Sequence, residues 1–316
     1  MTKFRRRHVL TDTLDSLYAQ EGLPSHVAGA RVLLVGEVLW DEFPDCARLG
    51  GAPLNVAVHL GRLRHAPLLV SAVGADRRGG ETRSALTALG LDTTFVGSTA
   101  QFQTGSARVR LGPGDETSFT IERPAAYDAV ELSGESLQRI VTWNPTWLYY
   151  GTLFPSFPQP RRVLSQLLDR LPRAARFYDL NLRPGFESLE LVDDLLRRAD
   201  VVKLNEQEVQ FVQGRLNLPM DPEGFCRAGA ERYGWRGACV TLGARGCAML
   251  VGDTYVAAPG LQVHVADPVG AGDAFAAAFI HGLVSSWPVE RVVTVANRIG
   301  ALVAASRGAI PDPGCP

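Results

Sequence analysis

The residues with the clearest chemistry lie in one short run, Asp267-Pro268-Val269-Gly270-Ala271-Gly272-Asp273, which small and apolar residues follow. Glycines before a helix leave backbone N–H groups open to an anion, and the helix dipole adds to the attraction. Asp273 would then stand beside an anion site, where a carboxylate takes a proton from a hydroxyl as that hydroxyl attacks a phosphoryl group. A small-molecule kinase requires this arrangement.

The same run also fits a plain structural interpretation. Glycine and aspartate are common in tight turns and at helix caps for conformational reasons alone. The run by itself therefore leaves a kinase site and a capped turn as alternatives.

Polar residues also follow the first predicted strand and open the first predicted helix. Asp41 comes shortly after Gly36-Glu37, and Gly50-Gly51-Ala52-Pro53-Leu54-Asn55 forms a flexible turn into a helix. Glycines let the backbone approach a ligand closely, and Asn55 offers both a donor and an acceptor. These residues suit a polyhydroxylated substrate.

Three later motifs also stand where a predicted strand ends. They read Asp179-Leu180-Asn181-Leu182-Arg183, Lys203-Leu204-Asn205-Glu206-Gln207-Glu208 and Thr241-Leu242-Gly243-Ala244-Arg245-Gly246. Taken singly, each is a turn or a solvated helix start. Together they suit a nucleotide, because Asn-x-x-Glu can hold magnesium through water and glycine turns can bind phosphates.

The elements that must position these motifs alternate between short apolar runs and helical patterns. This predicts a doubly wound, mostly parallel α/β sheet with flanking helices, in which ligands bind beyond the carboxyl ends of the strands. The predicted strands span 32–35, 69–73, 94–96, 147–150, 176–179, 201–203 and 238–241, and the predicted helices include 53–64, 81–89, 161–170 and 189–198.

Two segments depart from this alternation. Residues 104–123 predict a hairpin, with strands over 106–111 and 117–122 joined by Gly112-Pro113-Gly114-Asp115, and such an insertion is typical of a small β lid over an active site. Residues 1–30 predict an N-terminal extension with a weak helical pattern, and residues 31–316 predict one kinase domain.

Composition narrows the class of partner. The 316 residues are 46% hydrophobic and carry a formal charge of -1, so neither nucleic acid nor a membrane is expected. The five cysteines show no spacing typical of zinc sites. No apolar run approaches the roughly 20 residues of a membrane span, and we expect a cytoplasmic protein.

The early motif Gly50 to Ala57 and the late run Asp267 to Asp273 together resemble the ribokinase-like (phosphofructokinase B type) family of sugar kinases, over Arg31 to Pro313. The resemblance implies transfer of the γ-phosphate of ATP, with magnesium, to a sugar hydroxyl. It also implies the roles of individual residues. Asp273 would be the base, with Gly270, Ala271 and Gly272 as the anion hole, and Glu208 would bind magnesium through water. The sugar would contact Asp41, Gly50, Gly51, Asn55, Arg108 and Arg183. The nucleotide would contact Asn181, Lys203, Asn205, Thr241, Gly243, Gly246 and Asn297.

Many members of this family also bind a monovalent cation. By that resemblance potassium would be held by Asp267, Val269, Ala304, Arg307 and Ala309, mostly through backbone oxygen. Pro268 and Val269 depart from the family pattern, which often has threonines there. The short interval between Asp41 and Gly50 predicts a lid strand that is short or absent, and the lids of this family often form the contact of a homodimer.

The choice of sugar rests on resemblance alone. The Gly36-Glu37 start, the Gly-Gly-Ala-Pro turn and the stretch Arg123-Pro124-Ala125-Ala126 are most similar to fructokinases. A 2-keto-3-deoxygluconate kinase is the alternative, since Arg108 and Arg183 suit a carboxylate. A non-catalytic regulatory protein derived from a kinase is a third interpretation, which the retained Asp273 disfavours.

Overall fold

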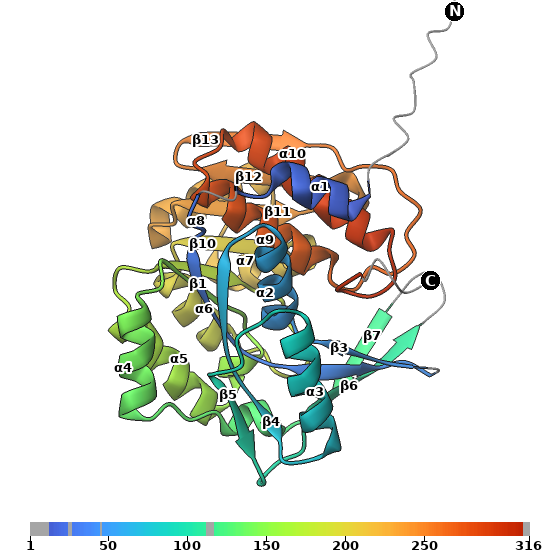
Figure 1. Cartoon of the computed structure of the whole chain (residues 1–316). Coiled ribbons are helices and arrows are strands. Elements are labelled where there is room, and N and C mark those ends of the chain that lie inside the picture. Colours follow the sequence, from blue (N-terminus) through green and yellow to red (C-terminus); the bar gives the residue numbers. More distant parts are fainter. Residues whose placement is uncertain (1–12, 25–26, 45, 112–116, 312–316) are drawn as a thin grey trace, which may run out of the picture.

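A single large sheet forms the centre of the molecule in the computed structural model, which describes residues 13–24, 27–44, 46–111 and 117–311 (Figure 1). Seven neighbouring strands run parallel, and an antiparallel pair closes one edge. The strand order is β13 (Thr254–Ala258), β12 (Cys247–Val251), β11 (Gly237–Thr241), β10 (Val201–Asn205), β9 (Ala175–Asp179), β8 (Trp147–Tyr150), β1 (Arg31–Val35), β4 (Ala66–Gly74) and β5 (Val96–Thr99).

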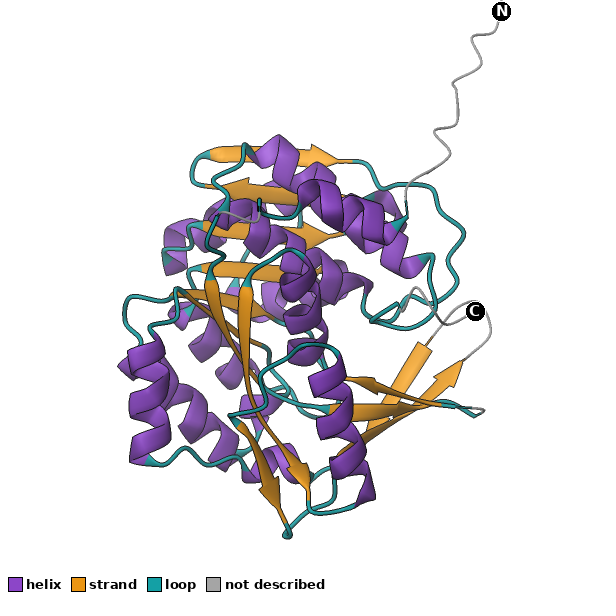
Figure 2. Cartoon of the chain, viewed as in Figure 1, coloured by secondary structure: helices purple, strands orange, loops and turns teal. Residues whose placement is uncertain are grey.

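Helices cover both faces of this sheet (Figure 2). One hydrophobic core packs under α4 (Gly134–Trp143), α5 (Pro158–Arg170), α6 (Leu189–Arg198), α7 (Glu206–Leu216) and α8 (Pro222–Tyr233). The other packs under α1 (Leu14–Glu21), α2 (Ala52–Arg62), α3 (Arg77–Ala88), α9 (Ala271–Val284) and α10 (Val289–Ala304). The predicted doubly wound α/β fold is therefore confirmed.

The alternation of side chains along β1 shows why its sequence is apolar throughout. Val32 and Leu34 belong to one core, whereas Leu33 and Val35 belong to the other. Because successive side chains of a strand point to opposite faces, a strand covered on both sides reads as a continuous hydrophobic run. Along β1 itself, the polar residues Arg31 and Glu37 stand only at or beyond its ends.

A second, smaller sheet stands beside the first. Its order is β3 (Ala47–Gly50), β2 (Leu39–Glu42), β6 (Gly105–Leu111) and β7 (Thr117–Ile121). The predicted hairpin is present as β6 and β7, while its connecting turn at 112–115 lies outside the described residues. The lid strand between Asp41 and Gly50 was predicted to be short or absent. It is present and short, since β2 and β3 each span only four residues.

Most predicted elements match, with differences at their ends. The predicted helix at 189–198 coincides with α6, but α3 begins at Arg77, where Asp76 caps it by accepting from Gly79 N, and not at residue 81. The strand predicted at 94–96 is β5, which starts at Val96. The strands β12 and β13, within 247–258, were not predicted.

The helical pattern predicted in the first 30 residues corresponds to α1. Thr13 caps this helix, and Leu17 and Tyr18 are buried in the core beside α10. Arg291 on α10 forms an ion pair with Glu21 at the end of α1. The start of the described chain is thus packed on the body of the molecule.

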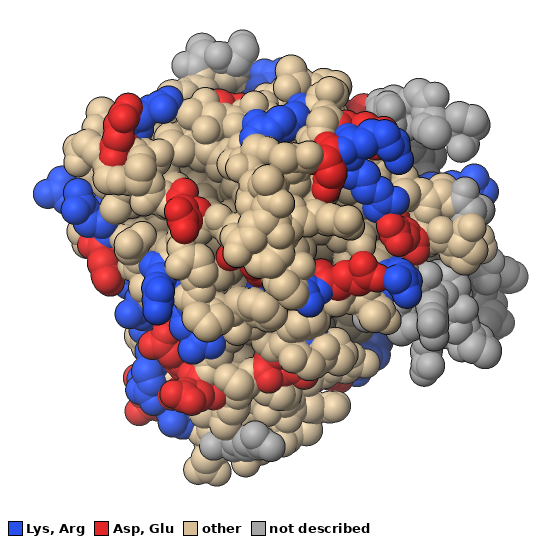
Figure 3. Space-filling view, turned by 90° about the horizontal axis from the view of Figure 1, so that it is seen from below, with Lys and Arg blue, Asp and Glu red and all other residues tan. Residues whose placement is uncertain are grey.

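The surface gives no sign of a single-sign charge patch on the face that Figure 3 shows, where lysine and arginine alternate with aspartate and glutamate. Within the described residues, no helix is both long and apolar enough to cross a bilayer.

Candidate active site

Two adjoining cavities lie beyond the carboxyl ends of the parallel strands, and they meet at the start of α9. One has a volume of about 280 Å³ and the other about 330 Å³. Both are lined by Thr241, Pro268 and Gly272. A ligand in one cavity can therefore reach a ligand in the other beside the N-terminus of α9.

The predicted site residues divide between these cavities. The first is lined by Asp41, Gly51, Asn55, Asn181, Arg183, Lys203, Asn205, Glu208, Val269, Gly270 and Asp273, together with the three shared residues. The second is lined by Gly243, Gly246, Ala271, Asn297 and Ala304. Gly50, Arg108, Asp267, Arg307 and Ala309 line neither cavity.

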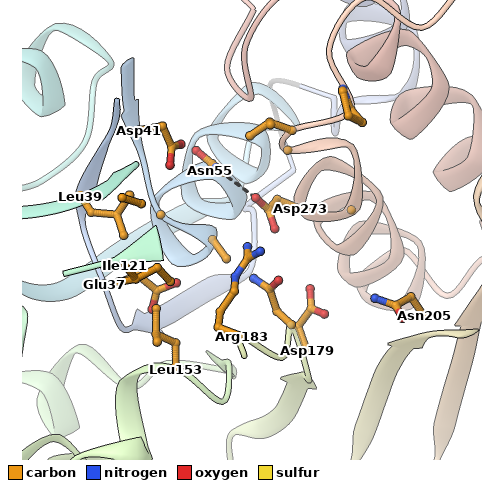
Figure 4. Close-up of a pocket in the computed structure, with 18 of the residues that line it drawn as sticks. Glu37, Leu39, Asp41, Asn55, Ile121, Leu153, Asp179, Arg183, Asn205 and Asp273 are labelled. Atoms are coloured by element: carbon orange, nitrogen blue, oxygen red, sulfur yellow. Dashed lines mark hydrogen bonds between the residues drawn. The ribbon is translucent and has the colours of Figure 1, made fainter. Parts of the chain in front are cut away.

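Asp273 occupies the first turn of α9 and points into the first cavity (Figure 4). Its Oδ2 accepts a 2.7 Å hydrogen bond from Asn55 Nδ2, which α2 supplies. Burial raises the pKa of Asp273 to about 7, against the opposing effects of the Asn55 hydrogen bond and of Lys203. A carboxylate with a pKa near neutrality is suited to accept a proton at physiological pH.

The turn before Asp273 depends on Gly270. This residue has φ of +81°, and a Cβ there would lie 2.3 Å from the Cβ of Ala309. Only glycine fits such a close approach without strain. The turn aims the first N–H groups of α9 at the joint of the cavities, and these groups have no carbonyl partner within the helix.

Lys203 and Asp179 form a buried ion pair beside this turn. Lys203 Nζ lies 2.8 Å from Asp179 Oδ1 and 3.0 Å from Oδ2. Burial alone would lower the pKa of Lys203, but Asp179, Glu208 and Asp273 outweigh it and hold the pKa above its ordinary value. A Cβ on Gly272 would lie 3.5 Å from Nζ, so a permanent positive charge stands next to the start of α9.

Asn205 and Glu208 form a capping box at the start of α7. Asn205 Oδ1 accepts from Glu208 N, and Glu208 Oε2 accepts from Asn205 N. Glu208 Oε1 accepts from Leu182 N at 2.8 Å, so both carboxylate oxygens are hydrogen-bonded to the backbone. Contact with magnesium through water, as predicted, fits this geometry better than direct ligation. No group of three or more Asp, Glu, His or Cys side chains within the described ranges forms a metal centre.

The first cavity also holds two buried carboxyl groups, those of Glu37 and Asp41. Burial raises the pKa of Asp41 to about 7 and also raises the pKa of Glu37. Gly50 stands behind Asp41, since a Cβ on Gly50 would lie 2.4 Å from Asp41 Oδ2. Asn55 Oδ1 is buried and has no hydrogen-bond partner in the described structure, which leaves an acceptor for a ligand hydroxyl.

The two arginines predicted on the sugar side differ in position. Arg183 points into the first cavity toward Asp273 (Figure 4). Arg108 lies on β6 with an exposed side chain that forms an ion pair with Glu122. The structure therefore brings Arg183 to the site and leaves Arg108 outside the cavity.

The second cavity is mostly apolar and contains the predicted nucleotide residues. Gly243 and Gly246 both have positive φ, and a Cβ on Gly246 would lie 2.0 Å from the carbonyl oxygen of Ala258. Asn297 Nδ2 is buried and has no hydrogen-bond partner in the described structure. A buried amide donor without a partner in an apolar cavity suits the polar edge of a planar heterocycle.

The predicted monovalent-cation loop is closed by protein contacts. Ala304 O accepts from both Ala266 N and Asp267 N, which uses its two lone pairs. Asp267 Oδ2 accepts from Arg48 Nη1 at 2.9 Å and from Gly308 N at 3.0 Å. Ala309 O faces His59, and Arg307 is exposed. The protein itself engages these oxygen atoms, and Arg48 supplies a positive charge at Asp267. The monovalent-cation site stays a prediction.

Three charged residues at or near the site, within the described part of the chain, were not among the predicted site residues. Glu37 and Asp179 line the first cavity, and both belong to motifs at strand ends, so their position could have marked them. Arg48 carries no such signal, because only the folded chain brings β3 to the loop that contains Asp267.

Comparisons with known proteins agree with this geometry. The family model described as "pfkB family carbohydrate kinase" matches residues 47–314. The chain is 30% identical to a fructokinase of Escherichia coli over 300 residues, which are 89% of this chain and 95% of that protein. It is 28% identical to fructokinase-1 of Oryza sativa, over 90% of this chain and 96% of the relative.

Among solved structures, a fructokinase of Vibrio cholerae O395 in a fructose, ADP and calcium ion bound form has a TM-score of 0.76 at 26% identity, covering 89% of this chain and 94% of that one. A double mutant of that enzyme in a fructose, ADP and potassium ion bound form has a TM-score of 0.77 at the same identity and coverage. The predicted resemblance is confirmed: the chain belongs to the pfkB family of carbohydrate kinases.

Proposed function

We propose that this sugar kinase transfers the γ-phosphate of MgATP to a hydroxyl of fructose at the joint of the two cavities. The observation that carries the proposal is the position of Asp273, a half-buried carboxylate in the first turn of α9, where Gly272 lines both cavities. A sugar in the first cavity and a nucleotide in the second would bring the two reacting groups together there.

In this mechanism Asp273 accepts the proton of the attacking hydroxyl. Asn55 orients the carboxylate through Oδ2, which leaves Oδ1 for the substrate. The Asn55 side-chain oxygen, which lacks a protein partner, accepts a second sugar hydroxyl. Asp41 and Arg183 complete the polar wall around the sugar.

The N–H groups at Gly270, Ala271 and Gly272 stabilise the charge on the transferring phosphoryl group. Such preorganised donors are among the largest contributors to catalysis, because they need not reorient as charge develops. Lys203 adds a positive charge beside Gly272, and Asp179 keeps its ammonium in place. Magnesium, when bound, neutralises the phosphates and positions them for in-line transfer.

The preference for fructose is supported by relatives with that name and by the fructose-bound relative of similar fold. A 2-keto-3-deoxygluconate kinase is the alternative, favoured by Arg183 inside the first cavity, where a guanidinium suits a substrate carboxylate. A homodimer remains a prediction, which sedimentation of the purified protein tests.

The direct experiment is ADP release from MgATP with fructose, 2-keto-3-deoxygluconate, ribose, tagatose, fructose 6-phosphate and adenosine. We expect fructose to give the highest kcat/KM. A higher value for 2-keto-3-deoxygluconate would assign the alternative substrate, and the absence of turnover with every compound would reject the proposed reaction.

A further inference from the structure

One face of α2 carries three polar contacts to parts of the site that are distant in sequence. Asn55, His59 and Arg62 follow one another at helical spacing, so their side chains lie on the same face. Asn55 donates to Asp273, His59 faces the carbonyl oxygen of Ala309 at 3.0 Å, and Arg62 donates to the carbonyl of Pro311 at 2.8 Å. This face of α2 thus holds both the candidate base and the segment that follows α10.

The segment held by His59 forms the back of the anion hole. Ala309 is buried, and its Cα and Cβ lie 2.4 and 2.3 Å from the point where a Cβ of Gly270 would stand. Gly270 and Ala309 are therefore in direct backbone contact, and a displacement of Ala309 changes the space available to the turn at Gly270. The N–H groups of the following helix are aimed by that turn.

The proton positions on His59 follow from its partners. The ring is fully buried, and burial lowers its pKa to about 3, so the imidazole is neutral. A carbonyl oxygen can only accept, so the single N–H must be on Nε2, where it donates to Ala309 O. Nδ1 then accepts from the hydroxyl of Tyr18, at 2.6 Å.

Tyr18 belongs to the N-terminal helix α1, which precedes the residues that match the family model, 47–314. Its ring stacks on that of His59 at a centroid distance of 5.9 Å, and the Arg62 guanidinium lies 5.8 Å from the Tyr18 ring centre. A hydrogen-bonded chain therefore runs from α1 through His59 to the loop behind Gly270.

We propose that His59 is a positioning residue for phosphoryl transfer, and that Tyr18 fixes the tautomer through which His59 holds Ala309 against Gly270. The inference rests on the proposed role of Gly270 to Gly272 as the anion hole. It gives the N-terminal helix a part in catalysis, although α1 contributes no residue to either cavity.

A second buried histidine provides a matched control. His281 is fully buried, and its Nε2 donates to the carbonyl oxygen of Glu21 at the end of α1, at 2.8 Å. Its Nδ1 accepts from His65 Nε2, and His65 Nδ1 accepts from Ala30 N. This chain also ties α1 to the body of the molecule, but it meets α9 in the last turn, at the end of the helix opposite to Gly270, and includes no residue of the cavities.

The test compares His59→Leu with His281→Leu in the full-length protein, because each removes a buried Nε2–H donor to a backbone carbonyl. We expect His59→Leu to lower kcat about tenfold, less than the loss of a direct oxyanion donor, with the KM values for ATP and sugar nearly unchanged. His281→Leu should keep kcat within about twofold of the wild-type value, even if it lowers the melting temperature as much as His59→Leu does. Tyr18→Phe keeps the stacked ring and should lower kcat several-fold, whereas His59→Gln, whose amide reaches Ala309 O, should recover most of the activity.

A readout other than turnover is the affinity for MgADP with aluminium fluoride and the sugar, compared with MgADP alone. His59→Leu should weaken the fluoride complex about tenfold and leave MgADP binding unchanged, since the complex mimics the transferring phosphoryl group. If the wild type is active and His59→Leu has the same kcat and the same affinity for the fluoride complex as the wild type, this inference fails while the proposed function stands. Equal losses of kcat in His59→Leu and His281→Leu would have the same meaning. If His59→Leu does not fold, a wild-type value of kcat in Tyr18→Phe would overturn this inference. A wild type inactive on every sugar would overturn the proposed function and this inference together.

Discussion

Asn55 and Asp273 are 218 residues apart in the chain, and a 2.7 Å hydrogen bond joins the amide of the first to the carboxylate of the second. Asn55 is on α2 and Asp273 is in the first turn of α9, and both side chains line the first cavity. This bond joins α2 to α9 at the site, and it lowers the pKa of the proposed base against the larger, opposite effect of burial.

The first prediction concerns Asp273 as the base. Replacing it by asparagine should lower kcat by about two to four orders of magnitude, the range that loss of a general base gives, while ATP affinity changes little. Steady-state kinetics and calorimetry measure the two quantities. Asp169→Asn on the exposed surface is the control, and wild-type turnover of Asp273→Asn would remove Asp273 from the mechanism.

A second prediction concerns the pH dependence of catalysis. The base must be unprotonated, so kcat/KM should rise with pH through the pKa of Asp273, about 7. The hydrogen bond from Asn55 lowers that pKa, so Asn55→Ala should move the rising limb to higher pH. Asp41 has a similar pKa, and the limb should persist in Asp41→Asn. Disappearance of the limb in that variant would assign it to Asp41.

A third prediction concerns the stability of the ligand-free protein. The pKa values of Asp273 and Asp41 are raised above their ordinary values, so the folded state binds more protons than the unfolded state between about pH 4 and 7. Their contribution to stability is therefore present at pH 4 and is lost as the pH rises through 7. At pH 8 Asp273→Asn should raise the melting temperature, because it removes the free-energy cost of burying a charged carboxylate. The rise should be about 2–4 °C for each kcal/mol of that cost. A lower melting temperature at pH 8 would contradict this assignment.

A fourth prediction concerns the ion pair of Lys203 and Asp179. Both side chains are buried, so removal of one partner leaves an uncompensated charge and should destabilise the protein by about 3–5 kcal/mol. Lys203→Met should also lower kcat, because the positive charge beside Gly272 is lost. The double variant Lys203→Met with Asp179→Asn should recover stability but not kcat. Recovery of both would show that the pair acts only on stability.

A fifth prediction concerns Arg48. Because its guanidinium provides the charge at Asp267, exchange of potassium chloride for choline chloride should change wild-type kcat by less than about twofold. Arg48→Ala should lower kcat, and potassium should then restore part of the loss. Arg245→Ala, at another surface ion pair, serves as the control. A strong potassium requirement in the wild type would contradict this role of Arg48 and support the cation site predicted from the sequence.

The parts of the fold that the sequence predicts are those with a periodic signal. The strand at 147–150 and the helix at 189–198 coincide with β8 and α6, because the first is a continuous apolar run and the second has apolar residues at helical spacing. The edge strands β12 and β13 were missed, since their apolar run also fits other assignments and β13 is only partly buried. Helix starts such as Arg77 depend on a cap whose role only the backbone reveals.

The candidate site was predictable where a residue and its neighbours in sequence form one motif. Gly270 to Asp273 and the capping box of Asn205 and Glu208 are such cases. Arg108 was placed at the substrate from its position in the lid, but its side chain pairs with Glu122 on the surface. Arg48 and His59 could not be assigned, because their partners lie 219 and 250 residues away.

The junction of the two cavities at Gly272 has one more consequence, for inhibitor design. Thr241, Pro268 and Gly272 line both cavities, so under the proposed function a single molecule that joins a sugar to an adenosine polyphosphate through a short bridge would occupy both. Such a molecule loses its translational and rotational freedom once and not twice, and so gains affinity over the separate parts without any new contact. The length of bridge that binds most tightly would then measure the distance over which the phosphoryl group travels.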